Sequence, residues 1–149
     1  PLFLYTRCMI RIKYNFFVDI KSLFGTLRYS FWLNRNNYIY HLSPFQLPHK
    51  LSLKKFANDT LKSLPSHIPN LVTKPYIVYL VHFGTYGSYH YPNQIILSLH
   101  QTPDKAAQTL IHELAHLMIE PEVKRNNLSH DEKEKMAELQ ETKIIQNKI

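Results

Sequence analysis

Apolar positions along the chain follow two periods, and the first half already shows both. The stretches Ile10–Val18 and Tyr38–Tyr40 are rich in β-branched and aromatic residues, which favours strands. From Leu53 to Leu64, apolar residues recur every three or four positions, which predicts a helix. The hydroxyl of Ser52 can cap that helix, because it can accept a backbone N–H left unpaired in the first turn.

The middle of the chain predicts two strands joined by a turn. Tyr76–Val81 is an apolar run after a proline, and Gln94–Leu99 is a second apolar run. Gly84 and Gly87 lie between them, where glycine is typical of a turn or loop. We therefore expect a strand, a loop and a second strand in this region.

The last third predicts two helices with clear start signals. Thr102 can cap the first, and Pro103 suits its first position because the missing N–H costs nothing there. We expect this helix to reach about Ile119 and to end at Pro121. Ser129 and a glutamate three residues later form a capping box, so a final helix should begin after Ser129 and continue to about residue 146.

Composition narrows the possible classes of protein. The chain has 149 residues, enough for one domain, and its only cysteine, Cys8, excludes an internal disulfide or a Cys-rich zinc ribbon. No apolar run approaches the ~20 residues of a membrane span, so we expect a soluble, cytoplasmic protein. Residues 1–102 hold 11 lysines and arginines against two acids, a balance of +9, whereas residues 103–149 have a balance of −2. The basic part could attract nucleic acid, but no nucleic-acid-binding motif accompanies it.

The predicted helix after Thr102 contains the motif H-E-x-x-H. His112 and His116 are four residues apart, so both imidazoles lie on one helical face and can bind one metal ion. Glu113 lies beside them, placed to take a proton from a metal-bound water. Imidazole nitrogen suits zinc, and a catalytic zinc keeps three protein ligands and one open position. A polar stripe among so many apolar neighbours favours a zinc site over a chance surface pattern.

The third ligand has two candidates on the final predicted helix. Glu134 lies 18 residues after His116, and His130 lies 14 residues after it. Their four-residue separation places both on one helical face, so spacing alone does not separate them, although we favour Glu134. Glu138 is one turn beyond Glu134 and could accept a hydrogen bond from a ligand histidine. The other reading of these glutamates is a solvated acidic face.

The motif followed by Glu134 and Glu138 resembles the gluzincin clan of zinc metallopeptidases, and the compact layout resembles the minigluzincins. The resemblance implies an α+β, zincin-like fold, with a small mixed sheet packed on an active-site helix and a C-terminal glutamate helix. It also implies an edge strand that binds an extended peptide or protein substrate, for which Ile95, Ile96 and Leu97 are the candidates. It covers about residues 52–149, so we expect residues 51–149 to form the catalytic domain. Residues 1–50 would be an N-terminal extension of unknown role.

This resemblance predicts a zinc-dependent metallopeptidase in which Glu113 activates a zinc-bound water. Two alternatives remain. One is a DNA-associated metalloprotease similar to the SprT-like proteins, with His130 as the third ligand. The other is a catalytically inactive metal-binding module. The sequence does not select a residue that stabilises the transition state, for which the candidates are His82, His90, His100, Tyr89 and Tyr91. The oligomeric state is also left open.

Overall fold

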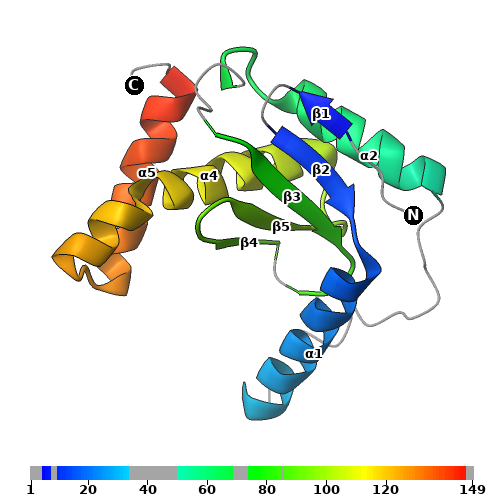
Figure 1. Ribbon diagram of the computed structural model, residues 1–149, viewed down its shortest axis with the longest axis horizontal. Coiled ribbons are helices and arrows are strands. Elements are labelled where there is room, and N and C mark those ends of the chain that lie inside the picture. The colour runs from blue at the N-terminus through cyan, green and yellow to red at the C-terminus, as the bar shows by residue number, and fades with distance from the viewer. Residues whose placement is uncertain (1–4, 8–9, 34–49, 69–73, 85, 147–149) are drawn as a thin grey trace.

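A five-stranded mixed sheet forms the centre of the molecule (Figure 1). The computed structural model describes residues 5–7, 10–33, 50–68, 74–84 and 86–146. The strands are β1 (Tyr5–Arg7), β2 (Ile10–Tyr14), β3 (Tyr76–Val81), β4 (Gly87–His90) and β5 (Gln94–Ser98). The helices are α1 (Phe16–Leu33), α2 (Lys50–Ser63), α4 (Pro103–Asn126) and α5 (His130–Gln146). This mixture confirms the predicted α+β class. Within these residues, no helix combines the length and hydropathy that a bilayer crossing requires.

The strand order is β1-β2-β3-β5-β4. The three central strands β2, β3 and β5 run parallel, and the two outer strands pair antiparallel with their neighbours. The strand expected at Tyr76–Val81 is confirmed residue for residue, and the one expected at Gln94–Leu99 ends one residue earlier. The strand expected at Tyr38–Tyr40 lies outside the described residues.

One face of the sheet packs against α2 and α4, and this contact forms the core (Figure 1). Burial alternates along β3, where Tyr76, Val78 and Leu80 are buried and the two residues between them are half-buried. This period of two is what a sheet with one covered face requires. The apolar stripe of α2 begins at Leu53, as expected, but the helix itself starts at Lys50, so Ser52 lies inside it rather than capping it.

The predicted strand Ile10–Val18 is wrong in its second half. β2 ends at Tyr14, and α1 begins at Phe16. The reason is local, because the side-chain oxygen of Asn15 accepts a hydrogen bond from the Phe17 backbone N–H at 3.0 Å. Asparagine is a favoured helix cap, so it starts a helix even though aromatic residues follow it.

The prediction that residues 94–99 form an edge strand is also wrong. β5 pairs with β3 on one side and with β4 on the other, so it is interior. Ile95 and Leu97 are fully buried, and Ile96 is half-buried. The segment around Gly87, expected to be a turn or loop, instead supplies the edge strand β4. Its four residues are too few and too polar to show a strand pattern in the sequence.

The expected boundary at residue 50 does not divide the sheet. β2 pairs with β3 over five residues, from Ile10 opposite Tyr76 to Tyr14 opposite Leu80. Ile10 and Ile12 belong to the same buried cluster as Leu110 of α4. Residues 5–14 are therefore part of the domain that carries the H-E-x-x-H motif, and not an extension outside it.

The last two helices, α4 and α5, begin with side-chain caps and pack on each other. Thr102 accepts a hydrogen bond from the Lys105 N–H, as its position predicts. α4 does not end at Pro121 but continues to Asn126, because Ile119 and Val123 pack on Ala137 of α5 in a second apolar cluster. The capping box at Ser129 is confirmed: its N–H donates to Glu132 Oε2 at 2.8 Å.

Candidate metal centre

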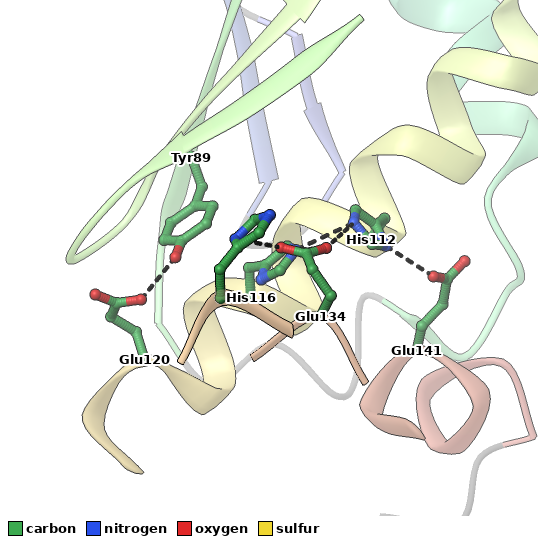
Figure 2. Close-up of polar contacts among 7 residues, drawn as sticks. Tyr89, His112, His116, Glu120, Glu134 and Glu141 are labelled. Atoms are coloured by element: carbon green, nitrogen blue, oxygen red, sulfur yellow. Dashed lines mark hydrogen bonds and ion pairs between the residues drawn. The ribbon is translucent and has the colours of Figure 1, made fainter. Parts of the chain in front are cut away.

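α4 carries both motif histidines, and α5 brings Glu134 to them. The buried apolar side of α4 fixes its rotation, with Leu110, Leu114 and Leu117 in the main core. This rotation turns His112 and His116 toward α5, where the Glu134 carboxylate lies between them (Figure 2). His112, His116 and Glu134 each offer one ligand atom, and these atoms all lie within 4.8 Å of one another. This group could hold a metal ion.

The separations of the three donor atoms match the size of a zinc ion's coordination shell. The two Nε2 atoms are 3.1 Å apart. Glu134 Oε2 lies 3.4 Å from Nε2 of His116 and 3.8 Å from Nε2 of His112. A point equidistant from three atoms so arranged is about 2.0 Å from each, which is the usual Zn–N and Zn–O bond length. Other divalent ions accept similar distances, so the geometry fits zinc without excluding them.

The structure brings Glu134 into the cluster and leaves His130 outside it. His130 lies at the start of α5 with its side chain 78% exposed, and its Nδ1 atom is 3.7 Å from the other oxygen of Glu134. Among the described residues, the metal-ligating group contains Glu134 and not His130. Burial also suits a ligand role for His116, because burial lowers its pKa and keeps the ring neutral, although Glu134 opposes that shift.

Glu141, rather than the predicted Glu138, contacts a ligand histidine. Its Oε2 atom lies 3.0 Å from Nδ1 of His112, on the side of the ring away from Glu134 (Figure 2). A carboxylate in this position accepts a hydrogen bond from the Nδ1–H group, which keeps the proton on Nδ1 and leaves Nε2 free to bind a metal. Glu138 is exposed, and it does not belong to the group of described residues that could hold a metal ion. Seven residues, two turns of α5, separate Glu134 from Glu141, so the same face of the helix supplies both carboxylates.

Glu113 is a buried carboxyl group with a raised pKa. Burial raises this pKa to about 7. Glu134 also raises this pKa, while His112 and Lys133 oppose the rise. A carboxyl group with such a pKa can both accept and release a proton near neutral pH.

An aromatic side chain from the edge strand lies against the second histidine. The Tyr89 ring stacks on His116, with centroids 5.1 Å apart and planes 10° from parallel. The Tyr89 hydroxyl donates to Glu120 Oε2 at 2.7 Å (Figure 2). Lys133 Nζ is 5.3 Å from the centroid of the Tyr89 ring. Burial, together with the Glu120 carboxylate, raises the pKa of Tyr89, so its hydroxyl remains protonated. These contacts hold His116 between β4 and α5.

An open pocket of about 440 Å³ adjoins the cluster. It is lined by Tyr86, Gly87, Gln108, Thr109, His112, Glu113 and Glu141. Gly87 of β4 lies directly against α4: a Cβ atom there would be 2.7 Å from Glu113 Oε1 and in contact with Thr109 Cγ2. Only glycine allows the edge strand to approach Glu113 this closely.

The other histidines considered in the sequence lie elsewhere. His82 contacts Asp19 of α1, with its Nδ1 atom 2.8 Å from the carboxylate. Its ring is 6.4 Å from that of His100, and His90 is exposed at the end of β4. Of the five candidates for a transition-state role, Tyr89 is the one whose ring stacks on a residue of the cluster in the described part of the chain.

The sequence alone did not identify Glu141, Glu120 or Gly87 as parts of this site. The spacing of Glu141 from Glu134 was the available signal, since a seven-residue step returns to the same helical face. Gly87 carried no signal beyond its turn propensity, because its role depends on how β4 packs on α4.

Comparisons with protein-family models, with curated proteins and with solved structures give no match for this chain. The interpretation of the site therefore depends on its geometry and chemistry.

Proposed function

We propose that this chain is a zinc-dependent metallopeptidase of gluzincin type with a zincin-like fold. The observation that carries the proposal is the convergence of His112, His116 and Glu134 at metal-binding distances, beside a buried carboxyl group on the same helix. The chain's order of elements supports it, since a mixed sheet precedes the motif helix and a second helix supplies the glutamate.

A divalent metal held by these three residues would supply a Lewis acid that polarises a carbonyl group and lowers the pKa of water. Glu113 would accept the proton of the attacking water and return it to the leaving amine. Its pKa of about 7 suits both steps at neutral pH. Glu141 would keep the proton on Nδ1 of His112, so that Nε2 faces the metal.

The outer edge of strand β4 is the reason to propose a peptide as the substrate. It pairs with β5 on one side only, and among the described strands it is the last in the sheet. An extended peptide can add to such an edge through backbone hydrogen bonds. Because Gly87 lies next to Glu113, a peptide bound along β4 would pass the proposed base. This role replaces the one expected for residues 94–99.

The exposed position of His130 gives no support to the DNA-associated alternative, in which it was the third ligand. The remaining alternative is an inactive metal-binding module, which has the same ligands and differs only in hydrolysis. The experiment must therefore measure metal binding and cleavage separately.

The test measures zinc content and peptide cleavage of the wild type and of Glu113→Gln. We expect one bound zinc per chain in both proteins and a loss of cleavage of about 10²–10⁴-fold in the variant. Glu122→Gln, at an exposed glutamate of the same helix, is the matched control and should keep full activity. Wild type that binds zinc but cleaves no peptide in a broad library would favour the inactive module. Cleavage that survives in Glu113→Gln would remove the proposed mechanism.

A further inference from the structure

The first half of α1 exposes large aromatic side chains, and this helix projects away from the sheet in Figure 1. Phe16, Phe17 and Phe24 are 54%, 75% and 66% exposed. In the same view, α2, α4 and α5 lie on other sides of the sheet from the projecting end of α1. Scattered single apolar residues are ordinary on a surface, but three phenylalanines within nine positions of one helix are typical of an interaction surface.

A polar contact ties the inner side of this helix to the sheet. Asp19 is only 3% exposed, and its carboxylate accepts hydrogen bonds from the His82 N–H at 2.7 Å and from the Tyr14 hydroxyl at 2.9 Å. The His82 ring makes a third contact with it at 2.8 Å. Because the acid faces the protein, Phe17 and Phe24 are left on the outside. The outer side of the helix thus carries three exposed phenylalanines, which indicates that it has an apolar partner.

The charge balance of the sequence from residue 1 to residue 50 indicates what that partner is. Residues 1–50 contain seven basic residues, Arg7, Arg11, Lys13, Lys21, Arg28, Arg35 and Lys50, against one acid, Asp19. The negative charge of Asp19 is buried in its own hydrogen bonds, while Arg11 and Lys21 are exposed. A second copy of the chain would bring like charges together, which opposes self-association. Aromatic residues beside basic ones instead match an anionic lipid surface.

We propose that α1 docks this protein on anionic membranes, with Phe16, Phe17 and Phe24 in the boundary between headgroups and acyl chains and Lys21 near the lipid phosphates. Single-stranded nucleic acid also combines negative charge with stacking on aromatic rings, but such sites are basic grooves. The three phenylalanines lie on the outside of a projecting helix, which suits insertion into a lipid surface better. The docking does not depend on the proposed peptidase activity.

The test is co-sedimentation of the full chain with vesicles of phosphatidylcholine, with and without phosphatidylserine. We expect binding to the anionic vesicles that weakens as salt is added, and little binding to the neutral ones. The double variant Phe17→Ser/Phe24→Ser should lower the affinity by roughly 100-fold, about tenfold for each phenylalanine. Leu139→Ser/Ile145→Ser, at two exposed apolar positions of α5, is the matched control and should bind like the wild type.

Several results would overturn this inference. They are no binding to anionic vesicles, equal binding to neutral vesicles, or equal losses in the two double variants. Self-association that the Phe17→Ser/Phe24→Ser change abolishes would assign the surface to a second copy. Binding of a single-stranded oligonucleotide that the same change abolishes, without vesicle binding, would assign it to nucleic acid. A thermal melt of each variant checks that the fold is intact, and cleavage of a soluble peptide should be unchanged by substitutions in α1.

Discussion

Alanine substitution at two glycines should have opposite effects on stability. A Cβ atom at Gly87 would contact Thr109 Cγ2 and approach Glu113 Oε1 to 2.7 Å and its Cγ atom to 3.2 Å. β4 must therefore move away from α4, and overpacking of this kind costs about 1–3 kcal/mol. At Gly25 of α1, a Cβ atom would meet nothing within 4 Å. Alanine there should stabilise the helix by about 0.5–1 kcal/mol.

Thermal unfolding followed by circular dichroism measures both effects. In a chain of this size, 1 kcal/mol shifts Tm by roughly 2–4 °C, so Gly87→Ala should lower Tm by about 2–12 °C. Gly25→Ala should raise it by about 1–4 °C. Because the new methyl group also displaces Glu113, Gly87→Ala should lose peptide cleavage while the three metal ligands still bind zinc.

A second substitution tests the cause of the loss at Gly87. Thr109→Ser removes Cγ2 and keeps the hydroxyl that donates to Gln101 Oε1 at 3.1 Å. The double variant Gly87→Ala/Thr109→Ser should therefore recover part of the lost Tm, as expected for two residues in contact. The reasoning is refuted if Gly87→Ala melts at the wild-type temperature, or if Gly25→Ala is destabilised to the same extent.

Three further predictions concern single side chains. Glu141→Gln should weaken zinc affinity by about 10–100-fold in a chelator competition, because it removes the acceptor at His112 Nδ1, whereas Glu138→Gln should have no effect. Tyr89→Phe removes the hydrogen bond to Glu120 but keeps the stacked ring, so it should lower the free energy of unfolding by about 1 kcal/mol in urea titrations. Burial opposes ionisation of Asp19, but hydrogen bonds from His82 and Tyr14 outweigh it and lower the pKa of the carboxyl group. This stability is present above the unfolded pKa of about 4 and is lost as pH falls through the lower folded pKa, so melts from pH 7 to 3 should decline less steeply in Asp19→Asn.

The elements that the sequence predicted well are those whose signals are local. β3 is a continuous apolar run after a proline, and α5 begins with a capping box, so each could be placed without knowing its neighbours. The same is true of His112 and His116, because a four-residue step on a helix fixes their shared face. Glu134 followed from the need for a third ligand.

The wrong predictions concern features that depend on contacts between distant parts of the chain. β5 looked like an edge strand because β4, with Gly87 and three polar or aromatic residues, has no strand pattern, and only pairing with β5 makes it a strand. Pro121 looked like a helix end, but packing of Ile119 and Val123 on α5 carries the helix past it. Glu138 was preferred to Glu141 because a four-residue step is usual in the clan that the motif resembles, whereas the crossing of α4 and α5 brings the later residue to His112.

Anomalous diffraction at the zinc edge, from crystals of the wild-type protein grown with zinc, tests the central claim most directly. The account predicts a zinc ion bonded to Nε2 of His112, Nε2 of His116 and a carboxylate oxygen of Glu134, each at about 2.0–2.2 Å. A zinc ion held by His130 in place of Glu134, or no zinc between α4 and α5, would contradict it.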